Sequence, residues 1–305
     1  MSVLDAAAVG VLRAGGAAIR LSPTRAWQPI GALMGRGMMV ASAKRVRITR
    51  ENIHTALPDL DVAEQEAIVR ASYRNLGITL AELLAVPSLT RDELLARVDI
   101  PGFDAVLERK ERRLPSIFLS AHYGNWEWLA LAAGVKLGAP LLIVTHPQSN
   151  ADADRLLNTY RCKFGNTVVP MGKAARPLVR TLSEGGTVAF LADQFAQWDK
   201  DPWISFFGRE TPTYEAPAAL ALKFNAPIFY AFAERNSNGT YHAPIQPIAM
   251  DHLAYNRSGI EELTKLHVQI LEEQVRKRPE LWSWQHRRWR SEYTKPSPQS
   301  TAQVL

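Results

Sequence analysis

Short apolar runs alternate with helical patterns across the middle of the chain, and this alternation restricts the fold more than any other feature. The runs that predict strands cover 117–121, 141–145, 167–170 and 187–192, and the helical patterns between them cover 126–135, 151–164 and 174–183. Such alternation places the strands in one sheet and lays the connecting helices on its faces. The sequence therefore predicts an α/β fold with a mixed central sheet flanked by helices.

The flanking sequence extends this pattern on both sides. Helices are predicted at 62–85, 214–224 and 260–277, strands at 227–234 and 240–247, a hairpin turn at 235–239, and a loop at 108–113. Glu82 falls within the first of these helices, and we interpret it as a solvated side chain.

His122, Gly124 and Glu127 follow directly after the first strand of the alternating region. Asn125 is a candidate N-cap for the next helix, so His122 would lie at the carboxyl end of a strand, where open α/β sheets bind ligands. On one continuous helix, His122 and Glu127 would lie roughly 140° apart, so they can meet only if the chain bends at Gly124. A neutral His oriented by Glu could accept a proton from a hydroxyl. The alternative is a structural His that caps a strand.

Asp193 and Gln194 come directly after another predicted strand. They therefore lie at a carboxyl strand end as well and could line the same cleft as His122. Asp193 could bind a sugar hydroxyl or hold its loop by accepting backbone N–H bonds, and we favour the structural role.

Four motifs occur in a fixed order along the chain. They are His122-Tyr-Gly-Asn-Trp-Glu127, Leu191-Ala-Asp193-Gln194, Phe206-Phe207-Gly208 followed by Thr211 and Thr213, and Trp284-Gln-His286-Arg287-Arg288-Trp289. In this order the chain resembles the bacterial lipid A biosynthesis acyltransferases, part of the wider glycerolipid acyltransferase group marked by His-x4-Asp/Glu. The resemblance spans about 45–289.

The resemblance implies an acyltransferase in which His122 is the general base and Glu127 orients it. The acyl group would pass from acyl-ACP or acyl-CoA, the co-substrate, directly to a hydroxyl of a lipid A precursor or related glycolipid, with no cofactor and no metal. The segment 197–213, which contains Phe207 and Arg209, would contribute to substrate binding. His286 and Arg287 would help to build the site. The substrate-binding candidates are Asn125, Arg161, Lys163, Asp193, Gln194, Phe207, Arg209, His286 and Arg287.

The developing oxyanion needs a donor, and the family often places an Arg just before the strand at 167–170. This chain offers Arg161 and Lys163 there, so two candidates stand open. The aromatic and basic block at 197–213 is interpreted either as a wall for the acyl chain or as an ordered covering loop.

The sequence lacks the motifs of other common enzyme classes. There is no Gly-x-Ser-x-Gly elbow and no His-Glu-x-x-His, and Cys162 lies in a helical pattern without a catalytic partner nearby. A metal hydrolase built from His122, Glu127, His146 and Asp193 is the remaining alternative of this kind. Because Cys162 is the one cysteine of the chain, no intrachain disulfide can form.

The first 43 residues are rich in Ala, Gly, Leu, Val and Met but are interrupted by Arg, so no stretch reaches the ~18 apolar residues of a spanning helix. One interpretation is a helix that lies in the membrane interface, with a face made of Val3, Ala6, Ala7, Val9, Leu12 and Ile19, followed by a second short helix at 31–40. The other is a helical hairpin that packs on the domain and leaves a solvated basic face. We therefore divide the chain into a membrane-associating helical segment at 1–43, an acyltransferase domain at 44–293 and a flexible tail at 294–305.

A formal net charge of +6 favours an anionic partner. Because no zinc-finger spacing or RNP-like motif is present, we expect a phospholipid surface and no nucleic acid. The expected location is the cytoplasmic face of the bacterial inner membrane, with peripheral or monotopic attachment. The alternatives for function are acylation of another lipid, such as a lysophospholipid or a glycosylated isoprenoid, and a non-catalytic lipid-binding protein of the same fold.

Overall fold

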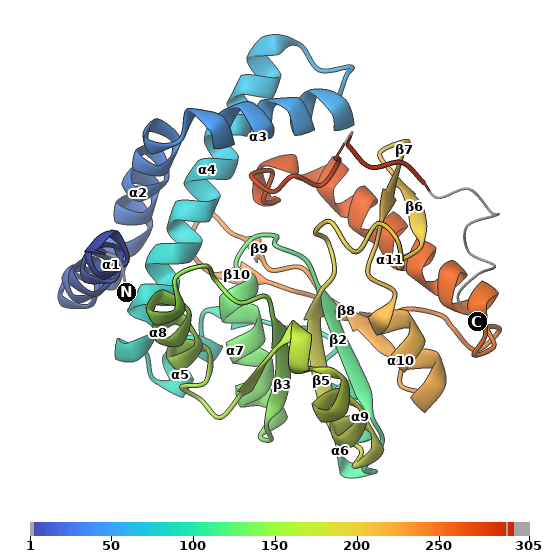
Figure 1. Cartoon of the computed structure of the whole chain (residues 1–305). Coiled ribbons are helices and arrows are strands. Elements are labelled where there is room, and N and C mark those ends of the chain that lie inside the picture. The colour runs from blue at the N-terminus through green and yellow to red at the C-terminus, as the bar shows by residue number, and fades with distance from the viewer. Residues whose placement is uncertain (1–2, 291, 296–305) are drawn as a thin grey trace.

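The computed structural model describes residues 3–290 and 292–295. A six-stranded sheet lies at its centre, in the order β11-β8-β2-β5-β3-β4 (Figure 1). Its strands are β2 (Ser116–Ser120), β3 (Leu141–Thr145), β4 (Thr167–Pro170), β5 (Thr187–Leu191), β8 (Ile228–Tyr230) and β11 (Gln246–Pro247). All neighbouring strands are parallel except β11, which pairs antiparallel with β8 at the edge. The predicted mixed α/β sheet is confirmed.

Helices cover both faces of this sheet (Figure 1). They are α5 (Arg91–Leu95), α6 (Asp104–Glu111), α7 (Trp126–Leu137), α8 (Ala151–Arg161), α9 (Ala175–Ser183), α10 (Ala216–Phe224) and α11 (Arg257–Lys277). Because side chains alternate along a strand, Phe118 of β2 packs in the core on the α7 side, while Ile117 and Leu119 pack in the core on the α11 side. The expected loop at 108–113 is wrong, because α6 continues to Glu111.

The described residues also form two small sheets and four 3-10 turns. The strands are β1 (Val98–Asp99), β9 (Glu234–Arg235) and β10 (Tyr241–His242) in one sheet, and β6 (Trp203–Phe206) and β7 (Arg209–Pro212) in a hairpin. The 3-10 turns are η1 (Thr24–Ala26), η2 (Val86–Ser88), η3 (Met171–Lys173) and η4 (Pro279–Leu281). Phe207 and Gly208 join β6 to β7 with φ of 52° and 71°, as a two-residue hairpin turn requires.

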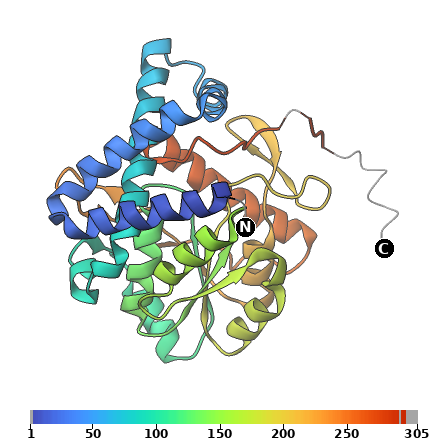
Figure 2. The same cartoon turned by 60° about the vertical axis from the view of Figure 1, so that its left-hand side comes forward.

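The first four helices are α1 (Val3–Leu21), α2 (Trp27–Ala41), α3 (Ala43–Ala56) and α4 (Val62–Ala85). Both α1 and α2 lie against α4, and Figure 2 brings this side forward. The apolar face proposed for membrane contact is turned the other way: Val9 and Ile19 are buried in the protein, and Leu12 packs against the core. The side chains of Val3, Ala6 and Ala7 lie outside the described residues, as does the tail at 296–305.

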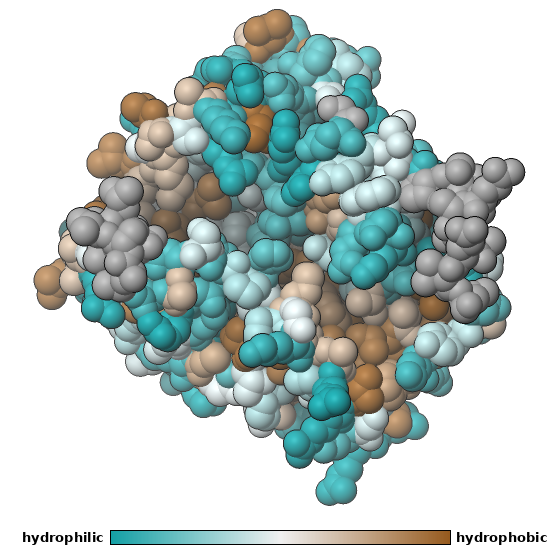
Figure 3. Space-filling view, in the orientation of Figure 1, coloured by the Kyte–Doolittle hydropathy of each residue, from teal (hydrophilic) through white to brown (hydrophobic). Residues whose placement is uncertain are grey.

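Other apolar side chains of α1 and α2 point outward. Val11, Leu21, Leu33 and Val40 are exposed, and Figure 3 shows hydrophobic residues gathered at the edge of the molecule over these helices. Within the described residues, none of the helices is both long enough and apolar enough to cross a bilayer.

Three glycines bring α2 and α4 into backbone contact. A Cβ atom on Gly77 of α4 would collide with the backbone of Gly31 and Gly35 on α2. Close packing of this kind leaves no side chain that could move aside, so the position requires glycine.

We therefore expect Gly77→Ala to lower the free energy of unfolding by about 1–3 kcal/mol through overpacking. Gly37→Ala is the matched control, since a Cβ there meets nothing within 4 Å and should stabilise α2 by up to about 1 kcal/mol. Urea unfolding followed by tryptophan fluorescence measures both changes. Equal midpoints for the two variants would contradict the close contact.

Candidate active site

His122 and Asp193 meet at the carboxyl edge of the sheet, because they follow the neighbouring strands β2 and β5. His122 Nδ1 lies 2.8 Å from Asp193 Oδ1, and the His122 backbone N–H donates to Asp193 Oδ2 over 3.1 Å. Of the two residues predicted to share the cleft of His122, Gln194 lines the same cavity, whereas Asp193 is buried behind the imidazole and does not line it. Asp193 does accept a backbone N–H bond that holds a loop, here the loop after β2, but it also binds the imidazole ring.

The Asp193 carboxylate is buried and stays ionised. Burial raises its pKa, but the adjacent His122 and the hydrogen bonds that it accepts outweigh burial and lower the pKa to about 2. One of these bonds comes from the indole Nε1 of Trp282, at 2.9 Å. The carboxylate is thus fixed on two sides, by the β2 loop and by the C-terminal segment.

One imidazole nitrogen of His122 is hydrogen-bonded to Asp193, and the other can accept a proton. Because a carboxylate only accepts hydrogen bonds, Nδ1 carries the proton toward Asp193, and Nε2 of the neutral ring keeps its lone pair. The His122 side chain is 24% exposed, compared with 2% for Asp193. Gln194 Nε2 lies 3.4 Å from each ring nitrogen, and the Trp126 ring packs edge-on against the imidazole. This arrangement suits a general base.

Glu127 has a different partner from the one predicted. Its two carboxylate oxygens accept from Arg161 Nε at 2.9 Å and Nη2 at 2.6 Å. Burial raises the Glu127 pKa, but the charge and hydrogen bonds of Arg161 outweigh burial and lower it. Among the described residues no hydrogen bond joins Glu127 to His122, so the expectation that Glu127 orients His122 is wrong. The first turn of α7 instead directs this carboxylate toward the end of α8.

A cavity of about 510 Å³ opens at His122 and runs between α7 and the sheet. His122, Glu127, Arg161, Gln194 and His286 line its polar part. Its apolar part is lined by Phe118, Leu129, Ala130, Ala133, Leu141, Ile143 and Ala189. A base, a cation and an apolar channel therefore share one cavity.

Three predicted substrate-binding residues serve the fold instead. Asn125 is fully buried, where it caps α7 by accepting from Trp128 N and donates to Glu82. Lys163 Nζ donates to three backbone carbonyls in and just after the η2 turn that follows α4, those of Val86, Pro87 and Leu89. Lys163 is therefore not available to a substrate, which leaves Arg161 of the two candidates; Arg45 and Arg290 also line the cavity.

Phe207, the third of these residues, is 6% exposed and packs near Trp284 and Trp289. Neither Phe207 nor any other residue of 197–213 lines the cavity at His122. This segment therefore does not form a wall for an acyl chain there. Glu82, which we expected to be solvated, is also buried. The helical spacing of Glu82 among apolar residues was a signal of its burial.

The C-terminal segment closes the site from one side. Ser283 N donates to the His122 carbonyl at 2.9 Å, and His286 Nε2 accepts from Phe195 N at 3.1 Å. Arg288 is buried and donates to the Gln194 carbonyl at 3.0 Å. Trp282 and Arg288 had no predicted role, although both lie among the Trp and Arg residues of the C-terminal region.

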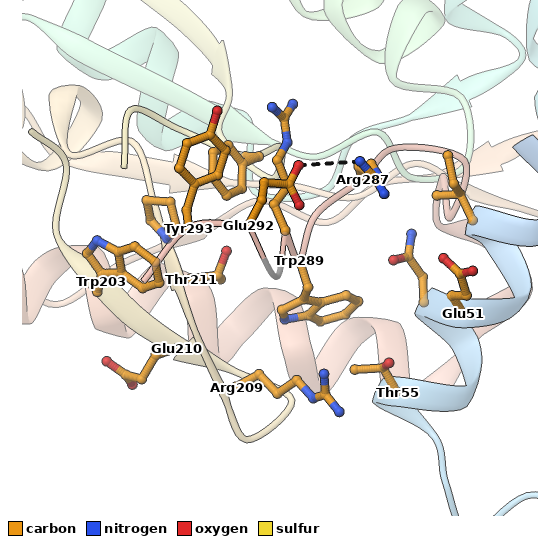
Figure 4. Close-up of a pocket in the computed structure, with 15 residues that line it drawn as sticks. Glu51, Thr55, Trp203, Arg209, Glu210, Thr211, Arg287, Trp289, Glu292 and Tyr293 are labelled. Atoms are coloured by element: carbon orange, nitrogen blue, oxygen red, sulfur yellow. Dashed lines mark hydrogen bonds and ion pairs between the residues drawn. The ribbon is translucent and has the colours of Figure 1, made fainter. Parts of the chain in front are cut away.

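Arg209 and Arg287 lie away from His122. Both line a second cavity of about 310 Å³, between the β6–β7 hairpin, α3 and the C-terminal segment (Figure 4). Phe195 and Arg290 line both cavities, so the two are neighbours. Within residues 3–290 and 292–295, no group of three or more His, Cys, Asp or Glu side chains is arranged to hold a metal ion.

Comparison with known proteins points to one family. The family model described as bacterial lipid A biosynthesis acyltransferase matches residues 3–291. The chain is 25% identical over 278 residues to the lipid A biosynthesis myristoyltransferase of Escherichia coli, covering 88% of this chain and 82% of that protein. It is equally similar to lipid A biosynthesis acyltransferase 1 of Shigella flexneri. The lipid A biosynthesis palmitoleoyltransferase of Escherichia coli is 20% identical over 263 residues, which cover 86% of this chain and 83% of that protein.

The surroundings of His286 predict a pH dependence of stability. Burial lowers its pKa to about 4; Asp193 opposes this effect, and the nearby cations reinforce it. Between pH 6.5, the ordinary pKa of His, and pH 4, the unfolded chain binds a proton that the native chain does not. His286 therefore makes stability fall as pH drops through this window, by roughly 1 kcal/mol per pH unit.

His286→Gln should remove this contribution, so the variant loses less stability than the wild type between pH 6.5 and 4. Urea unfolding at several pH values measures the difference, and titration of the His286 ring by NMR locates its pKa directly. Parallel stability curves for the two proteins would contradict a neutral, partly buried His286.

Proposed function

Because the chain belongs to the bacterial lipid A biosynthesis acyltransferase family and is therefore an acyltransferase, we propose that it transfers a fatty acyl group to a hydroxyl of a lipid A precursor or related glycolipid. The donor is an acyl thioester, acyl-ACP or acyl-CoA, and no other cofactor takes part. The observation that carries this proposal is the His122–Asp193 pair, whose available nitrogen lies at the mouth of an apolar cavity.

In the proposed reaction, His122 Nε2 takes the proton of the acceptor hydroxyl as its oxygen attacks the thioester carbonyl carbon. Asp193 stabilises the imidazolium that forms and holds the ring in the tautomer that leaves Nε2 free. When the tetrahedral intermediate collapses, the C–S bond breaks and the thiolate takes the proton from Nε2. An ester and a free thiol result, and the enzyme returns to its starting state without a covalent intermediate.

Arg161 is the proposed donor to the oxyanion. Glu127 and Asn158 use three of its five N–H groups, which leaves two for the developing negative charge in the cavity. The bidentate bond to Glu127 fixes the guanidinium plane, so little reorganisation is needed when the charge forms. Glu127 thus acts as a positioning residue for Arg161, and Asp193 as a positioning residue for His122.

The apolar part of the cavity is the proposed site of the acyl chain. Its lining by Ala130, Ala133 and Leu129 from α7, and by Ile143 and Ala189 from the sheet, matches the chemistry of a hydrocarbon chain. Ala133 lies seven residues after the start of α7, about 10 Å along the helix at 1.5 Å per residue. Its side chain would therefore contact the far part of a long acyl chain.

Membrane attachment is proposed to be peripheral or monotopic, through the first 43 residues and at the cytoplasmic face of the bacterial inner membrane. Exposed Val11, Leu33 and Val40 on α1 and α2 offer apolar contact, and the exposed Arg36 and Lys44 nearby suit anionic headgroups. The membrane-facing surface is then the outward face of these helices, opposite the face of α1 that carries Val9, Leu12 and Ile19.

His122→Ala should lower kcat by about 10²–10⁴-fold, the usual contribution of a general base. Asp193→Asn should also lower kcat, and the double variant should lose little more than His122→Ala, because Asp193 acts through His122. Rates are measured with purified protein, an acyl thioester and a lipid A precursor, with mass spectrometry identifying the acylated product. A folded His122→Ala protein with near-wild-type turnover would contradict the mechanism. If the losses of kcat in the two single variants add up in the double variant, Asp193 does not act through His122.

Ala133→Leu should shorten the accepted acyl chain, because added bulk fills the far end of the cavity. We expect kcat/KM for a myristoyl donor to fall by about tenfold or more relative to an octanoyl donor. Ala219→Leu on α10 adds the same volume away from the cavity and serves as the control. If the ratio of the two donors is the same in both variants, the acyl chain lies elsewhere.

A further inference from the structure

Gln194 reaches the catalytic cavity from a short segment whose backbone is held on both sides. It follows the buried Asp193, and the next residue, Phe195, donates its backbone N–H to His286 Nε2 over 3.1 Å. The carbonyl of Gln194 itself accepts from Arg288 Nη1 at 3.0 Å. These contacts fix the place from which the Gln194 side chain extends, and that side chain lines the cavity.

Arg288 is a buried guanidinium that serves this segment. It is 2% exposed, and its side chain donates to the carbonyls of Gln194 and Pro212 and to the hydroxyl of Thr213. It forms no ion pair with a carboxylate of residues 3–290 and 292–295. A buried charge without a contacting counterion costs free energy, and burial lowers the pKa of Arg288 to about 10. The charge is thus retained where it holds the backbone of Gln194 in place.

The carboxamide of Gln194 stands beside the imidazole of His122 without occupying its lone pair. Gln194 Nε2 lies 3.4 Å from both His122 Nδ1 and His122 Nε2. A point at equal distances from the two nitrogens lies in the plane midway between them, whereas the lone pair of His122 Nε2 points away from that plane, so the contact is poorly aligned for a hydrogen bond. Within the described part of the chain, the carboxamide has no better partner. Its N–H groups are therefore available to a substrate beside the base.

We propose that Gln194 is a further catalytic residue, whose amide N–H donates to the oxyanion of the tetrahedral intermediate together with Arg161. The inference rests on the proposed function, in which His122 Nε2 takes the proton of the attacking oxygen. The oxyanion and the attacking oxygen are bonded to the same carbon atom, so a donor beside His122 Nε2 is near the developing charge. Gln194 neither gains nor loses a proton, and its hydrogen bond weakens again when the C–S bond breaks and the carbonyl re-forms.

Gln194→Met tests this donor, because Met has a similar length and no N–H group. The variant should lower kcat by about 10²–10³-fold, the usual loss for one oxyanion donor. A thioether analogue of the acyl donor lacks the carbonyl, so its Kd should stay within twofold of wild type. Gln269→Met on α11 is the control, because Gln269 is exposed and lies outside the cavity. Urea unfolding checks the fold of both variants.

Two results of these measurements would overturn the proposal. One is a Gln194→Met protein with near-wild-type kcat. The other is a loss of affinity for the thioether as large as the loss of kcat, because Gln194 would then serve binding of the donor rather than the oxyanion.

Hydrolysis of acyl-CoA tests the same donor without a lipid acceptor. Water replaces the hydroxyl, the products are a fatty acid and a free thiol, and a chromogenic thiol reagent follows the rate. His122→Ala and Gln194→Met should each slow hydrolysis by about tenfold or more. If only His122→Ala does so, the base stands and the role of Gln194 is wrong. If both do so but no glycolipid is acylated, the role of Gln194 is supported and the proposed acceptor is wrong.

Discussion

The buried carboxylate of Asp193 connects three parts of the chain that are distant in sequence. It follows β5, accepts two hydrogen bonds from His122 at the end of β2, and accepts a third from Trp282 in the C-terminal segment. A buried carboxylate without such donors would cost several kcal/mol. The donors must therefore be present together in the folded protein. The base is correctly placed only when the C-terminal segment has docked, so the last part of the domain completes the site.

The turn that carries His122 is held from the opposite side by α4. Thr79 and Asn75 donate to the Gly124 carbonyl, at 2.8 and 3.3 Å, and Gly124 has a φ of 58°. A Cβ on Gly124 would collide with the Ala233 carbonyl, so only glycine allows the strand to turn here. Glu82 binds Asn125, the cap of α7, and lies 3.7 Å from Arg235. These buried polar groups fix the position of the turn relative to α4.

Local patterns predicted most of the fold, because strand and helix periodicity depends on nearby residues. The strand at 141–145 and the helix at 62–85 have the predicted bounds. The partners in the site were harder to predict, since spacing does not say which distant side chain a carboxylate will meet. The spacing pairs His122 with Glu127, which is near it in sequence, whereas its actual partner is Asp193, which follows the adjacent strand β5. Sequence order also could not show which apolar face of α1 is buried, because that depends on packing against α4.

The exchange of partners has a chemical consequence. If Glu127 were bound to His122, Arg161 would be left largely buried without its counterion, and Asp193 would lose its strongest donors. In the observed arrangement each carboxylate has its own partner: Asp193 binds His122, and Glu127 binds Arg161. A low dielectric strengthens both pairs and makes unpaired charges costly. One pair therefore supplies a neutral nitrogen that can accept a proton, while the other keeps a permanent positive charge in the same cavity. These are the two groups that attack on a thioester by a hydroxyl requires.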